Sequence, residues 1–189
     1  MTLQLIWRVL YYSWFLSEVL IVLVTYTRGG RGKLSDRGSM LLLWVVIAGS
    51  ITASGWIDGK MPHNMLAGAH GLGIVAVTLL ATGLALRWTA VITLGRAFSV
   101  NVAVHDDQCV HKTGLFRFVR HPSYMAMMII FLAIGLATRN WYCLAIMMVL
   151  PFSALVYRMH VEEAALISAF GEEYLAYSRV TKRLVPFVY

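Results

Sequence analysis

Residues 124–157 read YMAMMIIFLAIGLATRNWYCLAIMMVLPFSALVY, and Arg139 is the only charged residue among them. The two apolar runs on either side of Arg139-Asn140, Tyr124 to Thr138 and Trp141 to Tyr157, approach the length that a helix needs to cross a hydrocarbon core about 30 Å thick. The first run is the shorter of the two. The stretch therefore predicts two helices that form a tight hairpin, with its tip near a membrane interface.

Three further apolar runs precede this hairpin: Leu3 to Tyr26, Met40 to Trp56 and Leu66 to Leu94. The whole chain is 59% hydrophobic and 13% charged, with a mean hydropathy of +0.71, which is outside the usual composition of soluble domains. We expect an all-α integral membrane protein with about five transmembrane helices. A mainly β soluble domain, a disordered chain and a disulfide scaffold are excluded, and the two cysteines are expected to be free thiols.

Lysine and arginine residues concentrate in three of the segments that flank these runs, and cytoplasmic loops normally hold this excess. The three groups are Arg28, Arg31, Lys33 and Arg37; Arg96, Lys112, Arg117 and Arg120; and Arg158, Arg179, Lys182 and Arg183. We therefore expect the N-terminus outside and the C-terminus in the cytoplasm. Membrane topology then explains the net charge of +7, and no nucleic-acid partner is predicted.

The chain has no linker or repeat, so residues 1–189 are expected to form one membrane-embedded domain. Its first part, residues 1–94, holds three spans, and residues 95–189 hold most of the polar groups. One polar stretch runs from Arg158 to Pro186, and within it an amphipathic helix is expected to leave the membrane, because Leu166, Phe170, Tyr174 and Tyr177 recur at helical spacing.

Several isolated features are interpreted as structural. Gly68, Gly71 and Gly73 lack the spacing of a nucleotide-binding loop and indicate helix packing. His105, His111 and His160 lack the spacing of a metal site, so no metal is predicted. Among charged residues within the spans, Arg8 is expected to reach the interface, and Glu18 and Arg87 to serve helix packing.

Arg158 and Glu162 are four residues apart at the cytoplasmic end of the last span, so they share one helical face. They are either a surface ion pair or a clamp for a ligand that has both charges. The segment Gly114 to Tyr124 favours the clamp, because it brings basic, aromatic and hydroxyl groups to the start of a span. Pro122 marks the change from loop to helix, where unpaired backbone N–H groups suit polar or anionic ligand atoms.

The segment Gly114 to Tyr124, which ends Arg-His-Pro-Ser-Tyr, precedes three further motifs: Glu162-Glu163, Phe170 to Tyr174 and Arg183 to Pro186. In this order they resemble the isoprenylcysteine carboxyl methyltransferase family and its phospholipid-methyltransferase relatives. The resemblance covers about Gly95 to Pro186, while the first three runs match only in hydrophobicity. It implies a helical membrane enzyme that uses S-adenosylmethionine without a Rossmann fold.

By this resemblance, the cofactor site consists of residues from the loop, the turn and the last span. They are Asn101, Gln108, Cys109, Val110, His111, Phe116, His121, Pro122, Ser123, Tyr124 and Glu162. Arg158 matches the arginine that engages the acceptor, so Arg158 and Glu162 are the expected catalytic residues. Two departures are Ala126, where many members have glycine, and Phe116, where tyrosine is common.

The implied reaction suits these residues, because a carboxylate acceptor is already ionised at neutral pH and needs no strong base. The expected acceptor is lipophilic, a prenylated cysteine or a similar small molecule that arrives from the membrane lipid, and no obligatory protein partner is evident. Alternatives of the same class are a phospholipid N-methyltransferase and a thiol methyltransferase. Alternatives of other classes are an NADPH-dependent membrane reductase and a non-enzymatic membrane scaffold.

Overall fold

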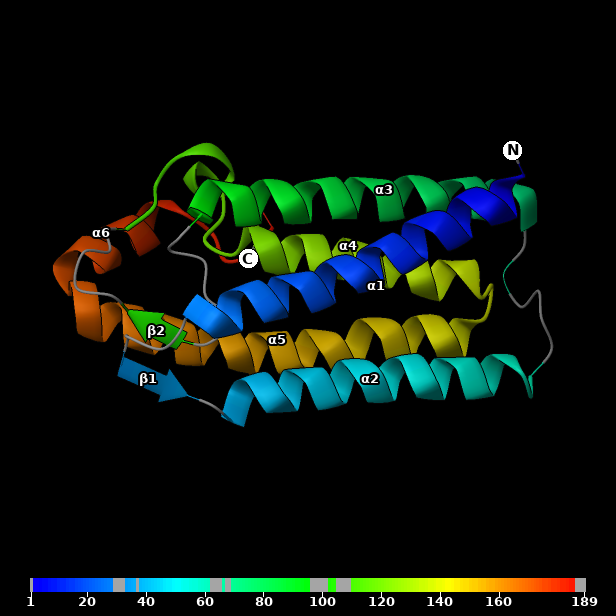
Figure 1. The fold of residues 1–189 in the computed structure, drawn as a ribbon, viewed down its shortest axis with the longest axis horizontal. Coiled ribbons are helices and arrows are strands. Elements are labelled where there is room, and N and C mark those ends of the chain that lie inside the picture. The colour runs from blue at the N-terminus through cyan, green and yellow to red at the C-terminus, as the bar shows by residue number, and fades with distance from the viewer. Residues whose placement is uncertain are drawn as a thin grey trace.

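The computed structural model of the chain describes residues 2–28, 33–36, 38–61, 66, 69–95, 102–104 and 110–185. Within these residues there are six α-helices, one short 3-10 helix (Gly114–Arg117) and two short β-strands. The helices are α1 (Leu3–Arg28), α2 (Gly38–Asp58), α3 (Ala69–Leu94), α4 (Pro122–Ala137), α5 (Trp141–Phe170) and α6 (Glu172–Val180), and the strands are β1 (Lys33–Asp36) and β2 (Val102–Val104). Helices α1 to α5 run back and forth along one long axis (Figure 1).

Four helices of the described part of the chain are long and apolar enough to cross a membrane, and they belong to α1, α2, α3 and α5. The predicted class, a helical integral membrane protein, is confirmed. Helix α4 is apolar but has only 16 residues, which at 1.5 Å per residue is about 24 Å. A fifth crossing by α4 therefore stays a prediction.

Strands β1 and β2 depart from the all-helical expectation. They pair antiparallel, with Lys33 opposite Val104 and Leu34 opposite Ala103. The pairing joins the connection between α1 and α2 to the segment that follows α3, at the end of the bundle where α6 lies (Figure 1). The segment that contains β1 has no alternating apolar pattern, whereas residues 98–105 read FSVNVAVH, in which apolar residues alternate as in a strand, and this signal was missed.

Helix α4 is the centre of the bundle, packed against α3 on one side and α5 on the other. Small residues allow these close approaches. A Cβ atom added at Gly83 of α3 would come within 2.7 Å of the Ile130 side chain and 3.1 Å of the Ala126 carbonyl oxygen. At Gly135 of α4 it would come within 2.9 Å of the Leu144 Cα atom.

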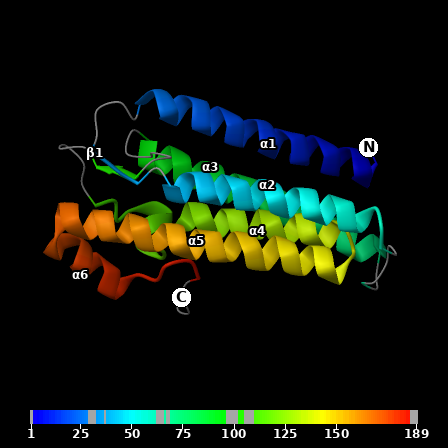
Figure 2. The same cartoon turned by 90° about the horizontal axis from the view of Figure 1, so that it is seen from below.

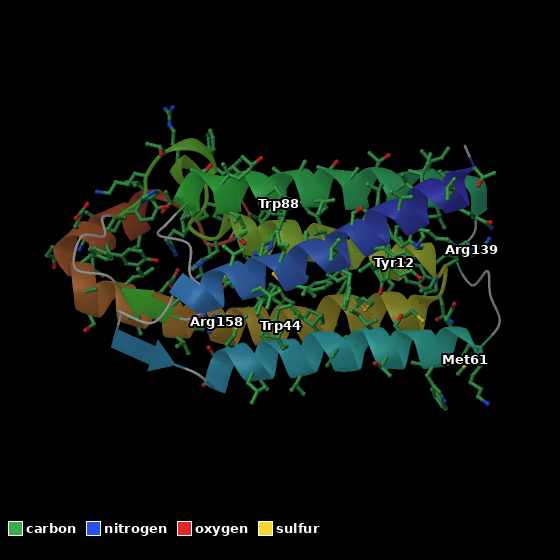
Figure 3. All side chains as sticks on the ribbon, viewed as in Figure 1. Tyr12, Trp44, Met61, Trp88, Arg139 and Arg158 are labelled. Atoms are coloured by element: carbon green, nitrogen blue, oxygen red, sulfur yellow. The ribbon has the colours of Figure 1, made fainter. Side chains whose placement is uncertain are left out.

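Helices α4 and α5 form the hairpin expected at Arg139-Asn140. Arg139 adopts a positive φ of 54°, and the Asn140 side chain accepts a hydrogen bond of 2.9 Å from the Tyr142 N–H, which caps α5. Helix α5 has 30 residues against 16 in α4, so it projects roughly 20 Å beyond the start of α4. Arg158 lies towards the end of the bundle near α6, and Arg139 lies at the opposite end (Figure 3).

The amphipathic stripe expected between Arg158 and Pro186, with Leu166, Phe170, Tyr174 and Tyr177, is divided between two helices. Helix α5 continues to Phe170 and is ended by Gly171, whose φ of +51° is in the left-handed region that favours glycine. Helix α6 then folds back beside α5 (Figure 2). It is itself amphipathic, because Tyr174 and Tyr177 are buried while Glu172, Glu173 and Arg179 are exposed.

Candidate functional site

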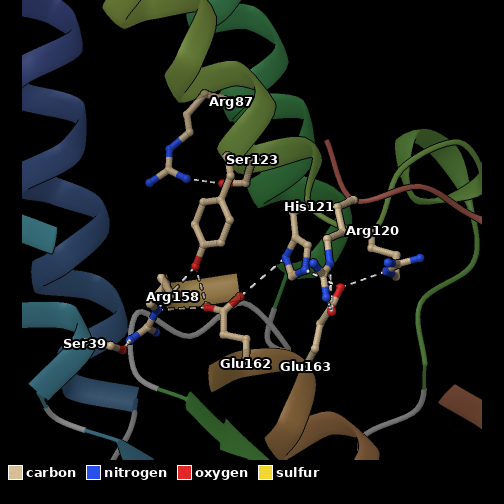
Figure 4. A network of polar contacts seen from close by, with 10 residues as sticks. Ser39, Arg87, Arg120, His121, Ser123, Arg158, Glu162 and Glu163 are labelled. Carbon is tan, nitrogen blue, oxygen red and sulfur yellow. Dashed lines mark hydrogen bonds and ion pairs between the residues drawn. The ribbon is translucent and has the colours of Figure 1, made fainter. Parts of the chain in front are cut away.

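Arg158 of α5 has partners on three helices. Its Nε donates to Glu162 Oε1 at 3.1 Å and lies 3.4 Å from the Tyr124 hydroxyl of α4, and its Nη1 donates to Ser39 Oγ of α2 at 2.7 Å (Figure 4). The residue is only 1% exposed. A guanidinium removed from solvent to this degree needs such partners, since a buried charge without them is costly.

Glu162 is the junction between α4 and α5. Its Oε1 also accepts a hydrogen bond of 2.5 Å from the Tyr124 hydroxyl, and its Oε2 lies 3.5 Å from His121 Nδ1. The rings of His121 and Tyr124 stack at a centroid distance of 5.4 Å and an interplanar angle of 10°. The Glu162 side chain keeps 20% of its surface exposed, whereas that of Arg158 keeps 1%. Of this pair, Glu162 is therefore the more accessible from outside the network.

The neighbouring residue, Glu163, accepts hydrogen bonds from both ends of the polar half of the chain. Arg120 Nε donates to it at 2.9 Å, and Arg183 donates through Nε at 3.0 Å and Nη2 at 2.7 Å. His121 Nε2 lies 3.3 Å from the same carboxylate. The imidazole thus lies between two carboxylates, with one ring nitrogen facing Glu162 and the other facing Glu163.

The turn that leads into α4 is held by the segment that follows α6. The backbone N–H of Arg120 donates to the Lys182 carbonyl at 2.7 Å, and that of His121 donates to the Arg183 carbonyl at 3.0 Å. Val119 and Lys182 thereby form a short parallel β-bridge. Tyr177 of α6 donates to the Phe116 carbonyl at 2.6 Å. Burial raises the pKa of Tyr177 to about 12, so the hydroxyl remains a donor at neutral pH.

The donor implied by the resemblance, S-adenosylmethionine, has a sulfonium and an ammonium, a carboxylate and a flat adenine ring. Glu162 suits a cation, and the stacked His121 and Tyr124 rings offer faces to a cation or a base. Within the described residues the buried Tyr174 hydroxyl has no hydrogen-bond partner. Burial, with the charge of nearby Glu163, raises the pKa of this phenol well above its ordinary value, so it is a neutral donor or acceptor. The residues present fit the donor.

The predicted site residues divide into three groups. Asn101, Gln108 and Cys109 lie outside the described residues. His121, Tyr124, Arg158 and Glu162 come together in one polar network, and Pro122 and Ser123 form the first turn of α4 beside it. Val110 and His111 are half-buried, and Phe116 is buried in the 3-10 helix under α6. Their roles towards a cofactor stay predictions.

Sequence reasoning missed four residues of the network: Ser39, Arg120, Glu163 and Arg183. Three of them had a signal, since each belongs to or adjoins a motif that was recognised: the Arg-His-Pro turn, the glutamate pair and the Arg-Leu-Val-Pro segment. Ser39 had none, because its contact spans 119 residues of sequence. In the described part of the chain no group of three or more His, Cys, Asp or Glu residues could hold a metal ion.

Comparisons with known proteins match this part of the molecule. The sequence model of the isoprenylcysteine carboxyl methyltransferase family matches residues 75–168, about half of the chain. Protein-S-isoprenylcysteine O-methyltransferase of Tribolium castaneum is 26% identical over 140 residues, which are 71% of this chain and 50% of the relative. Enzyme B of the same name from Arabidopsis thaliana is 32% identical over 59% of this chain and 58% of the relative. The chain spans about half the length of the curated relatives that it matches.

A solved structure of a eukaryotic intramembrane Ras methyltransferase has the same fold as this chain. The TM-score is 0.61 at 21% sequence identity, with 76% of this chain and 52% of the other covered. The family match includes the turn into α4, Arg158 and both glutamates. On the match to the family model and the similarity to the curated relatives, the chain belongs to the isoprenylcysteine carboxyl methyltransferase family.

Proposed function

We propose that this chain is an S-adenosylmethionine-dependent methyltransferase of the membrane that acts on the carboxylate of a lipophilic acceptor, such as a prenylated cysteine. The observation that carries the proposal is the polar network of Arg158, Glu162, Tyr124 and His121, buried where α5 passes the start of α4. An arginine, a carboxylate and two stacked rings are the groups that an anionic acceptor and a cationic donor require together.

The residues have separate roles in this proposal. Arg158 holds the acceptor carboxylate, since its permanent charge and planar fork suit two oxygens. Glu162 and the His121 to Tyr124 turn hold the donor, with Asn101, Gln108, Cys109, Val110, His111 and Phe116 completing its site. When bound, the donor supplies a methyl group on a positively charged sulfur.

Positioning is the main catalytic contribution expected of the chain. An ionised carboxylate is already a nucleophile, so none of these residues has to remove a proton. Holding the acceptor oxygen in line with the methyl carbon and the sulfur is worth roughly 7 to 11 kcal/mol of the barrier. Exclusion of water by the surrounding helices strengthens the contacts of Arg158 with the acceptor.

We also propose the topology that this reaction needs. The end of the bundle with α6 and the site faces the cytoplasm, from which the donor enters, and the N-terminus lies on the other side. The acceptor enters from the bilayer, and residues 1–189 act as one membrane-embedded unit. The distribution of Lys and Arg supports this orientation.

Cofactor binding is the first test of the proposal. In detergent, saturating S-adenosylhomocysteine should raise the Tm by roughly 5 °C or more, because a ligand that binds only the folded state stabilises it. NADPH at the same concentration is the control and should have no effect. Stabilisation by NADPH alone would instead identify a reductase, and stabilisation by neither would leave the methyltransferase proposal without support.

The product is the second test. With methyl-labelled donor and a prenylcysteine, the label should appear in a base-labile methyl ester, and kcat should be nearly flat from about pH 6 to 9, where a carboxylate stays ionised. A base-stable methylamine formed from a phospholipid, with kcat rising steeply with pH, would contradict the carboxylate acceptor. An amine must lose a proton before it can attack, which explains the different pH profile.

A further inference from the structure

A buried ion pair lies beside the site but outside the roles described above. Arg87 of α3 donates through Nε and Nη2 to the two carboxylate oxygens of Glu18 on α1, each at 2.9 Å. Its Nη1 bonds Ser123 Oγ at the start of α4 (Figure 4). Glu18 is 4% exposed, Arg87 6% and Ser123 9%. One guanidinium thus connects three helices.

Stability alone does not account for such a pair. Taking two charges out of solvent carries a desolvation cost that their attraction only partly returns, and apolar residues of similar volume often hold helices together equally well. Ionisable residues within membrane spans usually serve a site or a pathway for the same reason. The question is which part of the molecule the pair holds in place.

The start of α4 is the part that needs support. His121 occupies the N-cap position, but its side chain makes no capping hydrogen bond, although a capping side chain normally stabilises this position. Ser123 is the second residue of the helix, between His121 and Tyr124, the two rings that contact Glu162. The bond from Arg87 therefore holds the turn from outside the helix.

The approach of α3 to α4 fixes where the guanidinium lies. Gly83 is one helical turn before Arg87 and lies against Ala126 and Ile130 of α4. Residues four apart share a helix face, so the close contact at Gly83 directs Arg87 towards the first turn of α4. Glu18 then fixes the rotation of the Arg87 guanidinium, because both carboxylate oxygens of Glu18 accept hydrogen bonds from it.

We propose that Glu18 and Arg87 are positioning residues, which act through Ser123 to hold the His121 to Tyr124 turn in its binding geometry. They do not touch the reacting groups. The inference rests on the proposed function for its effect on turnover, but its effect on the turn is independent of any ligand. It also gives α1, which lies outside the family match, a part in the site.

The test replaces the pair with an apolar one. The double variant Glu18→Leu with Arg87→Met should keep its Tm within about 3 °C of wild type. Both charges of the pair are removed together, so neither is left buried without its partner. Its affinity for S-adenosylhomocysteine should fall about tenfold or more and its kcat about 100-fold, because a small misplacement of positioned groups has effects of this size. Ser123→Ala should change the same quantities in the same direction.

Two further measurements separate positioning from a structural role. Amide hydrogen exchange of residues 123–127, measured on ligand-free protein, should be faster in the double variant than in wild type. Ser17→Ala is the matched control, because Ser17 lies next to Glu18 on α1 and is also buried. Its hydroxyl donates only to the Trp14 carbonyl of the same helix among the contacts described. It should leave exchange and ligand affinity unchanged.

The outcomes are distinguishable. A stable double variant with wild-type exchange in α4 and wild-type ligand affinity would overturn the positioning role. If wild-type protein fails to bind S-adenosylhomocysteine, the proposed function fails, yet faster exchange in the stable variant would still support positioning. If the double variant loses its Tm in proportion to its affinity, the pair is structural and the inference is wrong.

Discussion

At the scale of single residues, the contacts of Arg158 define what it can do. Its guanidinium is bonded to a serine, a tyrosine hydroxyl and a glutamate from three different helices, and it is almost fully buried. A side chain held on several sides loses little further freedom when an anion joins it, so the proposed binding of the acceptor carboxylate would have a low entropic cost. Glu162, with a fifth of its side-chain surface exposed, is more open to a cation.

Replacing the two residues should have different effects. Arg158→Ala should lower kcat by about 100-fold while leaving S-adenosylhomocysteine affinity largely unchanged, because in the proposed mechanism the arginine holds the acceptor and not the donor. Glu162→Ala should weaken S-adenosylhomocysteine binding directly. Arg158→Lys should restore activity only partly, since lysine keeps the charge but lacks the planar fork. Turnover and ligand binding, measured on the same preparations, check these expectations.

Arg179→Ala is the control for these variants, because Arg179 is an exposed arginine of α6. It should retain wild-type turnover and affinity. Wild-type activity in both alanine variants of Arg158 and Glu162 would mean that the pair is only a contact on the helix surface.

Whether a contact between two residues could be predicted from the sequence depends on how far apart they are along the chain. The Arg158–Glu162 contact follows from a spacing of four within one helix, and the turn at Pro122 follows from proline chemistry. The contacts of Tyr124 with Glu162 and of Ser39 with Arg158 depend on how helices pack, which periodicity does not determine. The Glu18–Arg87 pair was expected to serve packing, and its link to Ser123 could be found only from the fold.

At the scale of elements, the contact between α3 and α4 depends on a glycine. A methyl group at Gly83 would meet Ile130 and the Ala126 carbonyl at distances below van der Waals contact. Gly83→Ala should therefore destabilise the protein by about 1 to 3 kcal/mol, as overpacking usually does. Thermal unfolding in detergent measures this.

Gly49→Ala on α2 is the matched control, since a Cβ atom there has no heavy atom within 4 Å. Its Tm should not fall, because alanine favours a helix at least as well as glycine. An unchanged Tm in Gly83→Ala would mean that α3 and α4 can separate slightly without loss of stability.

The apolar runs predicted the long helices well, because spanning a membrane imposes a length and a composition that one sequence displays. The end of α5 was predicted less well. The apolar stripe that continues past Gly171 suggested one helix, but the backbone of this glycine turns the chain back as α6. The β1–β2 ribbon was missed although residues 98–105, FSVNVAVH, have the apolar alternation of a strand, whereas the pairing partner at Lys33–Asp36 has no such pattern.

At the scale of the whole molecule, segments far apart in sequence close one end of the bundle. Residues 181–184 lie against the turn at Arg120-His121, and Arg183 shares the Glu163 carboxylate with Arg120. Arg183→Met should lower stability by about 1.5 to 3 kcal/mol, the usual contribution of hydrogen bonds to a charged group, and should weaken S-adenosylhomocysteine binding. A thermal melt with and without ligand checks both effects.

Lys182→Met is the matched control, because it changes the adjacent cation in the same way while its side chain is exposed. Its backbone bond to Arg120 remains, so stability and binding should stay near wild type. Equal losses of stability and of ligand binding in Arg183→Met and Lys182→Met would mean that the positive charge of this segment is responsible, and not the contact of Arg183 with Glu163.

The backbone bonds from Arg120 and His121 to Lys182 and Arg183 also impose an order on biosynthesis. The ribosome makes the chain from its N-terminus, so α1 to α5 have been synthesised before residue 183 exists. The His121 turn therefore receives its last two hydrogen-bond acceptors only after every spanning helix has been made. A chain interrupted during synthesis before this point would contain α1 to α5 but would lack a complete site.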